Sequence, residues 1–99
     1  MVAKLIDGKA VAAEIRQEIA QDVIKLKDRG ITPGLGTLLV GEDPGSRSYV
    51  AGKHRDCAEV GIESIRVELP DNADEASIAN AIEDLNSASE VSGFIVQLP

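Results

Sequence analysis

The stretch that decides the fold is residues 35–62, LGTLLVGEDPGSRSYVAGKHRDCAEVGI. Its first part, Leu35–Val40, is a short and mostly apolar run, which predicts a strand buried on both faces. An Asp-Pro-Gly turn follows and leads into a helix that carries Tyr49 and Lys53 and stops at Gly61. A buried strand, a turn and a helix in this order are typical of one unit of an α/β protein.

Hydrophobic spacing predicts further elements on both sides of this unit. Apolar residues every three to four positions predict helices, whereas strict alternation or a short apolar run predicts strands. Asp7 can cap the first helix and Gly30 can end it. In chain order we expect a helix at residues 10–29, a strand at 35–40, the helix that ends at 61, a strand at 62–69, a helix at 74–86 and a strand at 93–98.

Alternation of helices and strands predicts a parallel sheet with right-handed crossovers. The alternating strand 62–69 has one exposed face, so we place it at an edge, and the doubly buried strand 35–40 in the middle. The fold class is therefore α/β, a three-layer αβα arrangement with a small parallel sheet in the order 2-1-3. No helix follows the third strand within the 99 residues, so we expect the sheet to be incomplete at its C-terminal side and partly bare there.

Ligands of open parallel sheets bind beyond the carboxyl ends of the strands, where the strand order reverses. Residues Gly41–Tyr49 and the sequence Gln97-Leu98-Pro99 should meet at that point. Tyr49 and Lys53 lie four residues apart, so they share one helix face. Such a pair is also common as an apolar ring with a lysine stem packed beside it, and Gln97 could simply satisfy nearby backbone.

Composition narrows the class of protein. Hydrophobic residues make up 43% and charged residues 27%, values typical of a globular domain, and 99 residues allow one small core. The net charge of −7 argues against nucleic acid as a partner, and no apolar run is long enough for a membrane span. A single cysteine, Cys57, excludes an internal disulfide and favours a soluble protein of the cytoplasm.

For the cysteine, the histidine and the paired glycines of this sequence we expect structural roles and no part in catalysis or ligand binding. Cys57 is expected to be a buried packing residue, because no activating partner is visible in the sequence. His54, the only histidine, is expected at the surface and facing away from Tyr49, and we expect no metal site. The glycines at Gly34 and Gly36 lack the third glycine of a dinucleotide loop, so no nucleotide-binding loop is recognised.

Two motifs resemble one family closely. VGEDPGSRSYVAGKHRDCAEVGI (residues 40–62) and GFIVQLP (93–99) are similar to the paired signatures of the methylenetetrahydrofolate dehydrogenase/methenyltetrahydrofolate cyclohydrolase family, in its N-terminal catalytic domain. The resemblance extends through LIDGKAVAAEIR (5–16) and so covers the chain. Gly45 and Arg55 depart from the family, which commonly has alanine and lysine at these positions.

The resemblance implies oxidation of methylenetetrahydrofolate with NADP and hydrolysis of the methenyl product to 10-formyltetrahydrofolate. It implies that Lys53 is the general acid/base, that Tyr49 stacks on the folate and that Gln97 hydrogen-bonds to the lysine. These three would form the catalytic set. The substrate-binding residues implied by the same match are Ser46, Tyr49, Lys53, Gln97, Leu98 and Pro99.

The family has more chain than these 99 residues. The resemblance implies that residues 1–99 are the catalytic domain, truncated at its C-terminus, and that a Rossmann domain binding most of the NADP is missing. The full-length form is expected to be a homodimer that acts on tetrahydrofolate derivatives. The 99 residues alone are expected to be inactive as a dehydrogenase.

Two other function classes share features of this sequence. Short-chain dehydrogenases also use a Tyr-x-x-x-Lys pair, but they need a glycine-rich dinucleotide loop before it, and the first 48 residues contain none. The second alternative is a small, non-enzymatic α/β binding or interaction domain with Tyr49 and Lys53 on a solvated rim.

Overall fold

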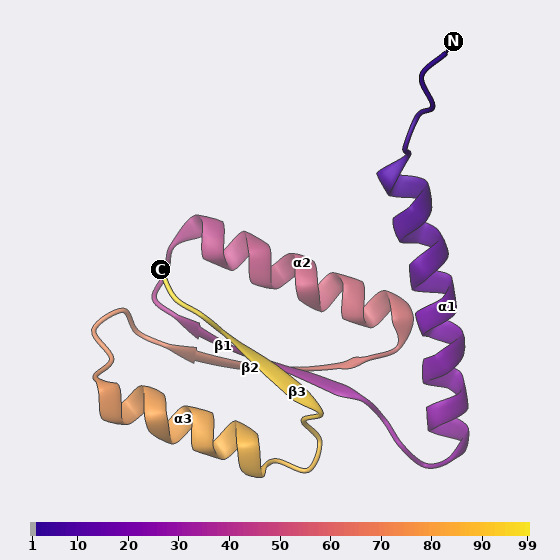
Figure 1. The fold of residues 1–99 in the computed structure, drawn as a ribbon. Helices are drawn as coiled ribbons and strands as arrows, with labels where there is room; N and C mark the ends of the chain where they lie inside the picture. The colour runs from indigo at the N-terminus through magenta and orange to yellow at the C-terminus, as the bar shows by residue number, and fades with distance from the viewer. Residues whose placement is uncertain (1) are drawn as a thin grey trace.

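The computed structural model describes residues 2–99 as helices and strands that alternate along the chain (Figure 1). The predicted order of elements is confirmed, with ends that differ from the expected ones by a few residues at most. The elements are α1 (Gly8–Asp28), β1 (Gly34–Val40), α2 (Pro44–Val60), β2 (Glu63–Leu69), α3 (Glu75–Ser87) and β3 (Gly93–Gln97).

The three strands form one parallel sheet in the order β2-β1-β3, as predicted. Strand β1 is central, and Leu39 pairs with Glu68 on one side and with Gln97 on the other. The carboxyl ends of all three strands therefore reach the same edge of the sheet. The alternating strand, β2, is at an edge of the sheet, also as predicted.

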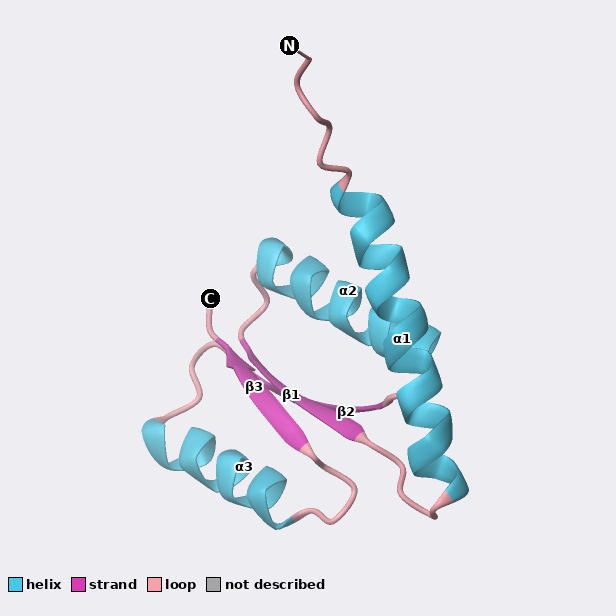
Figure 2. Cartoon of the chain, turned by 45° about the vertical axis from the view of Figure 1, so that its right-hand side comes forward, coloured by secondary structure: helices cyan, strands magenta, loops and turns pink. Residues whose placement is uncertain are grey.

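Helices α2 and α3 cover opposite faces of this sheet, which gives the predicted three layers (Figure 2). On the α3 face, Leu38 and Val40 pack against Ala81 and Leu85, and these residues form the core cluster. The intervening residues of β1 point to the α2 face, where Leu39 is 1% exposed. Alternate residues of β1 thus pack against helices on opposite sides of the sheet.

The ends of the helices follow the predicted chemistry. The Asp7 side chain accepts a hydrogen bond from the backbone N–H of Ala10 at 3.2 Å, so Asp7 caps α1 as expected. Asp43 caps α2 in the same way, and Gly61 ends it in the left-handed conformation with φ of 89°. Caps of this kind satisfy backbone groups that the helix itself leaves unpaired.

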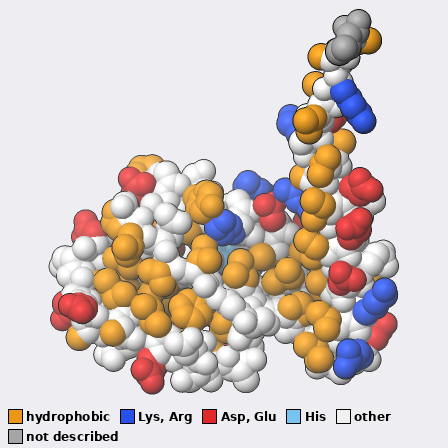
Figure 3. Space-filling model, viewed as in Figure 1, with side chains coloured by type: hydrophobic (Ala, Val, Ile, Leu, Met, Phe, Trp, Pro, Cys, Tyr) orange, Lys and Arg blue, Asp and Glu red, His pale blue; other side chains and the backbone are white. Residues whose placement is uncertain are grey.

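Helix α1 extends away from the sheet and touches the body mainly through α2 (Figures 1 and 3). Its predicted apolar stripe is present but remains accessible: Val11, Ile15 and Ile19 are 49%, 48% and 38% exposed. Only Val23 of this helix is buried. Apolar surface also remains beside β3, where Val96 is 38% exposed. Within residues 2–99, none of the helices combines the length and apolar character that crossing a membrane requires.

Leu38 should be the most sensitive point of the core, because its side chain is fully buried in the middle of β1. Leu38→Ala removes packed methyl groups and leaves a cavity, so we expect the free energy of unfolding to fall by roughly 2–5 kcal/mol. Urea unfolding measured by circular dichroism tests this. Val11→Ala on the accessible face of α1 is the control and should change the value by less than about 0.5 kcal/mol. Equal effects of the two substitutions would contradict the assigned core.

Candidate functional site

An open pocket of about 490 Å³ lies at the carboxyl edge of the sheet. The loop after β1, the first turns of α2 and the end of β3 form its walls. It is therefore located where the strand order reverses, the usual ligand position in such sheets. The lining residues are Asp43, Gly45, Ser46, Tyr49 and Gln97.

Hydrogen bonds hold the walls of this pocket together. The Asp43 carboxylate accepts a hydrogen bond from the Ser46 backbone N–H at 2.9 Å. The Ser46 hydroxyl then donates to the Leu98 carbonyl at 3.2 Å, which joins the start of α2 to the end of β3. Ser46 is 6% exposed, so this contact is shielded from water. A neutral, shielded hydrogen bond of this kind contributes about 1 kcal/mol.

Gly41 allows the chain to turn tightly below the pocket. Its φ of 90° is strained for any residue with a side chain, and its N–H donates to the Leu69 carbonyl at 2.9 Å. A Cβ atom at this position would lie only 3.0 Å from Cγ of Pro99. The backbone at Gly41 therefore lies close to the Pro99 ring, and a side chain at this position would be crowded against it.

Tyr49 and Lys53 contact each other on α2. The Lys53 Nζ atom lies 3.9 Å from the centroid of the Tyr49 ring, which is a cation–π contact. Tyr49 is 57% exposed and lines the pocket, whereas Lys53 is partly buried and stands behind the ring rather than in the pocket wall. No carboxylate within residues 2–99 forms an ion pair with Lys53. A ligand that reaches the pocket would meet the ring first and the ammonium at its edge.

Gln97 enters the pocket from β3. Its side-chain amide N–H approaches the Leu98 carbonyl at 3.5 Å, which is at the limit of hydrogen bonding. The amide therefore retains donor and acceptor capacity for a ligand. The structure brings Ser46, Tyr49 and Gln97 to one pocket, the Leu98 carbonyl accepts a hydrogen bond from Ser46 in its wall, and Pro99 lies next to Gly41. The chemical roles assigned to these residues, and to Lys53, stay predictions.

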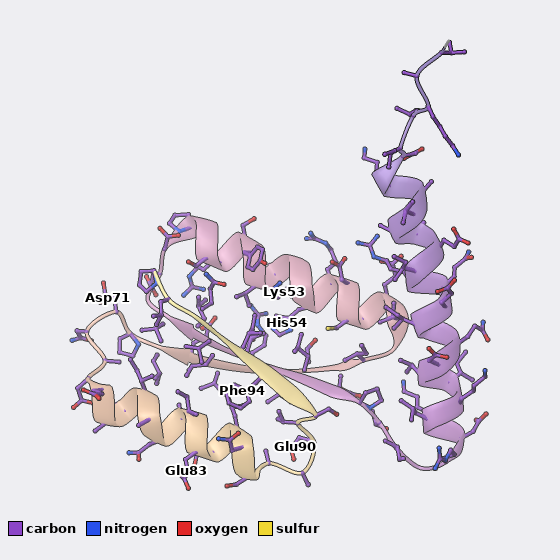
Figure 4. The ribbon with its side chains drawn as sticks, in the orientation of Figure 1. Lys53, His54, Asp71, Glu83, Glu90 and Phe94 are labelled. Atoms are coloured by element: carbon purple, nitrogen blue, oxygen red, sulfur yellow. The ribbon has the colours of Figure 1, made fainter. Side chains whose placement is uncertain are left out.

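His54 is partly buried and faces the sheet, whereas the sequence-based interpretation placed it at the surface. It points from α2 toward the sheet, next to Lys53 (Figure 4), and its Nε2 atom lies 2.9 Å from the Thr37 hydroxyl of β1. Desolvation, with a smaller contribution from the positive charge of Arg66, lowers the pKa of His54. The missed signal was spacing: His54 lies four residues after Val50 and three before Cys57, both of which are buried.

Cys57 is buried at 7% exposure, as the sequence predicted for a packing residue. Burial raises the pKa of its thiol above the ordinary value, which keeps it in the unreactive protonated form. The residue therefore belongs to the interface between α2 and the sheet. It offers no nucleophile to the pocket.

The described residues do not fit the phosphates of a dinucleotide. Gly34 and Gly36 lie inside β1 rather than between a strand and a helix, where phosphate-binding glycines belong. At the start of α2, the Asp43 carboxylate already accepts from the helix N–H of Ser46 and would repel a second anion. In residues 2–99 we also find no group of three or more His, Cys, Asp or Glu side chains arranged to hold a metal ion.

A three-layer α/β fold with a polar pocket at the strand-order reversal defines a class of ligand-binding domains. Comparison with known families then identifies the member of that class. Residues 6–99 match the family described as "tetrahydrofolate dehydrogenase/cyclohydrolase, catalytic domain". The chain belongs to this family.

Solved structures agree with this assignment. The bifunctional enzyme FolD, methylenetetrahydrofolate dehydrogenase/cyclohydrolase, from Campylobacter jejuni is 38% identical with a TM-score of 0.93, over 97% of this chain and 34% of that one. The Trypanosoma brucei enzyme, in complex with NADP cofactor and an inhibitor, is 35% identical with a TM-score of 0.91, over 98% and 33%. A silkworm (Bombyx mori) 5,10-methylenetetrahydrofolate dehydrogenase is 33% identical with a TM-score of 0.92, over 99% and 34%. The chain thus spans about one third of the length of these relatives.

The thiol of Cys57 should react slowly while the protein is folded. Burial and the protonated state both withhold the thiolate, so we expect modification by a disulfide reagent at pH 7.5 to be at least roughly tenfold slower in buffer than in urea. Thiol release followed by absorbance measures both rates, with Cys57→Ser as the blank. A folded-state rate equal to the rate in urea would contradict the assigned burial.

Proposed function

We propose that this chain supplies the folate-binding and proton-transfer part of an enzyme of one-carbon metabolism. The reactions are oxidation of methylenetetrahydrofolate to methenyltetrahydrofolate with NADP and hydrolysis of the latter to 10-formyltetrahydrofolate. Family membership over residues 6–99 supports this proposal. The observation that carries it is local: the Tyr49 ring and the Gln97 amide line one open pocket, and the Lys53 ammonium lies 3.9 Å from the centroid of that ring.

The pocket suits a flat, aromatic and polar ligand. Tyr49 presents an exposed ring on which a pterin can stack, and stacking of aromatic rings contributes about 0.5–1.5 kcal/mol beyond burial. Gln97 supplies hydrogen-bonding groups from the end of β3, and Ser46 adds a hydroxyl beside Tyr49 on α2. Leu98 and Pro99 continue the chain beyond the end of β3 and would contact the ligand there.

In the hydrolysis, a water molecule attacks the electrophilic methenyl carbon and forms a new C–O bond. A proton then leaves the added water, and a ring nitrogen takes up a proton as its bond to that carbon breaks. Lys53 is the group that we assign to carry this proton, because it is the cationic side chain nearest the stacking ring. Gln97 would hold the Lys53 side chain in position by hydrogen bonding, and the pocket geometry supplies the orientation.

NADP does not fit the described residues, because they offer its phosphates no glycine-rich turn and no free helix N-terminus. We propose that its binding residues lie mostly outside residues 1–99, in a Rossmann domain of the whole protein, as the sequence resemblance implies. Residues 1–99 alone should then lack dehydrogenase activity. A homodimeric whole protein and a location in the cytoplasm are further proposals that rest on the same resemblance.

Lys53→Met tests the proposal directly. Methionine keeps much of the length and apolar volume of the lysine stem but cannot carry a proton, and loss of a general acid/base typically slows a reaction by roughly 10²- to 10⁴-fold. The measurement is the loss of methenyltetrahydrofolate absorbance, with the unmodified chain and a protein-free blank in the same buffer. Hydrolysis above the blank that disappears with Lys53→Met is the expected result.

Lys25→Met is the matched control, because Lys25 is an exposed lysine near the end of α1 and far along the chain from the pocket. It should hydrolyse the substrate as fast as the unmodified chain. Equal hydrolysis by the Lys53→Met chain would contradict the proposed role of Lys53. If the 99-residue chain hydrolyses no faster than the blank, residues outside it are required, and Lys53→Met in the whole protein is then the deciding test.

A further inference from the structure

His54 is a polar residue on the buried side of α2, and the proposed chemistry does not use it. The buried residues of this helix are Ser46, Val50, Cys57 and Val60, and His54 lies within the same stripe. Its partner, Thr37, is 1% exposed in the centre of β1. The other ring nitrogen, Nδ1, is buried without a hydrogen-bond partner. The positions between a helix and a sheet are usually apolar, so the polar pair His54–Thr37 is unusual here.

Besides the exposed ion pair between Arg47 and Glu68, two hydrogen bonds join α2 to the sheet and to the segment after β3, and these two bracket the site. At the start of the helix, Ser46 donates to the Leu98 carbonyl, and two turns later His54 pairs with Thr37. Tyr49 and Lys53 lie between these two points. Contacts such as those of Val50 and Cys57 are apolar, and apolar contacts are non-directional, so they tolerate small shifts of a helix. Hydrogen bonds require a defined distance and angle.

We propose that His54 is a positioning residue: its bond to Thr37 fixes the height and rotation of α2 on β1 and thereby fixes the positions of Lys53 and Tyr49 relative to Gln97. Thr37 lies two residues before Leu39, which pairs with Gln97. The pair His54–Thr37 is thus only about 7 Å along β1 from the level of Gln97. Lys53 is the residue directly before His54. The predicted effect of His54 on hydrolysis rests on the proposed function. The predicted effect of His54 on the position of α2 does not.

The surroundings of His54 favour a neutral imidazole over a protonated one. When Nε2 donates to the Thr37 hydroxyl, Nδ1 keeps only an unpaired lone pair, whereas protonation would add a buried N–H without an acceptor. Arg66 of β2 also disfavours a positive charge on the ring. The other charged residue of β2 on this face is Glu68, which forms an ion pair with Arg47 at 3.5 Å. The residues that β1 and β3 direct toward α2 carry no ionisable group: Leu35, Thr37, Leu39, Ile95 and Gln97.

The sequence makes this inference easy to measure, because Tyr49 is the only tyrosine, His54 is the only histidine and tryptophan is absent. We would follow the ring NMR signals of both residues from pH 8 to pH 5.5 in the 99-residue chain. The His54 signal should titrate below its ordinary midpoint of about 6.5. The Tyr49 signal should move with the same midpoint, because a protonated ring adds a buried N–H without an acceptor, which favours a shift of α2 away from the sheet and alters the contact of the Tyr49 ring with Lys53.

Variants separate positioning from simple packing. In His54→Gln the amide Nε2 stands near the place of the imidazole Nε2, so Tyr49 should keep its signal at pH 8 and lose the titration. His54→Leu and Thr37→Val both remove the bond, so each should displace the Tyr49 signal at every pH. Hydrolysis of methenyltetrahydrofolate should fall by roughly tenfold in kcat for His54→Leu, with little change in KM, and by less than about threefold for His54→Gln.

The inference would be overturned if the Tyr49 chemical shift stays constant while His54 titrates and is also unchanged in His54→Leu. If His54→Leu does not fold, the comparison of Thr37→Val with the pH titration of the unmodified chain decides in the same way. The NMR measurement needs no folate. Failure of the proposed function, seen as equal hydrolysis by the Lys53→Met chain, is therefore distinguishable from failure of this inference.

Discussion

The burial of β1 on both of its faces is the constraint on which the rest of the structure depends. Leu38 and Leu39 are 0% and 1% exposed, yet they point to different layers. A fully buried leucine contributes about 1.5–3 kcal/mol of hydrophobic free energy, a large share for a domain of 99 residues. Because both layers pack on the same strand, the positions of α2 and α3 are defined relative to β1. The pocket follows from this arrangement, since it lies at the carboxyl end of the strand.

Much of this architecture could be predicted from local patterns. The apolar run of β1 and the alternation of β2 determine which strand is central and which is at an edge, and the strand order then places the pocket. The spacing of His54 from Val50 and Cys57 could have indicated that it faces the sheet, but its hydrogen bond to Thr37 could not be predicted, because Thr37 belongs to another element. The exposure of the apolar stripe of α1 could not be predicted either, because periodicity shows that an apolar stripe exists but not whether another element packs on it.

The residues of the site have two roles: some connect the walls of the pocket, and others face a ligand. Ser46 and Gly41 connect the loop after β1 to the segment after β3 by a hydrogen bond and a close backbone approach. Tyr49 and Gln97 supply the ligand-facing surface, and Lys53 supplies a charge beside it. The pocket is open, so a ligand bound here would keep part of its surface in water, and affinity would depend mainly on stacking and on a few hydrogen bonds. Positioning of these few groups therefore matters more than the size of the pocket.

Folate binding at the carboxyl edge of the sheet is the central claim. The most direct measurement is a titration of the isotopically labelled chain with 5-formyltetrahydrofolate, a stable folate, followed through the backbone amide NMR signals. We expect the shifted signals to cluster in residues 41–53 and 93–98. A cluster in the apolar groove between β2 and α3, lined by Val67, Ala81 and Leu85, or no saturable shifts at all, would contradict the claim.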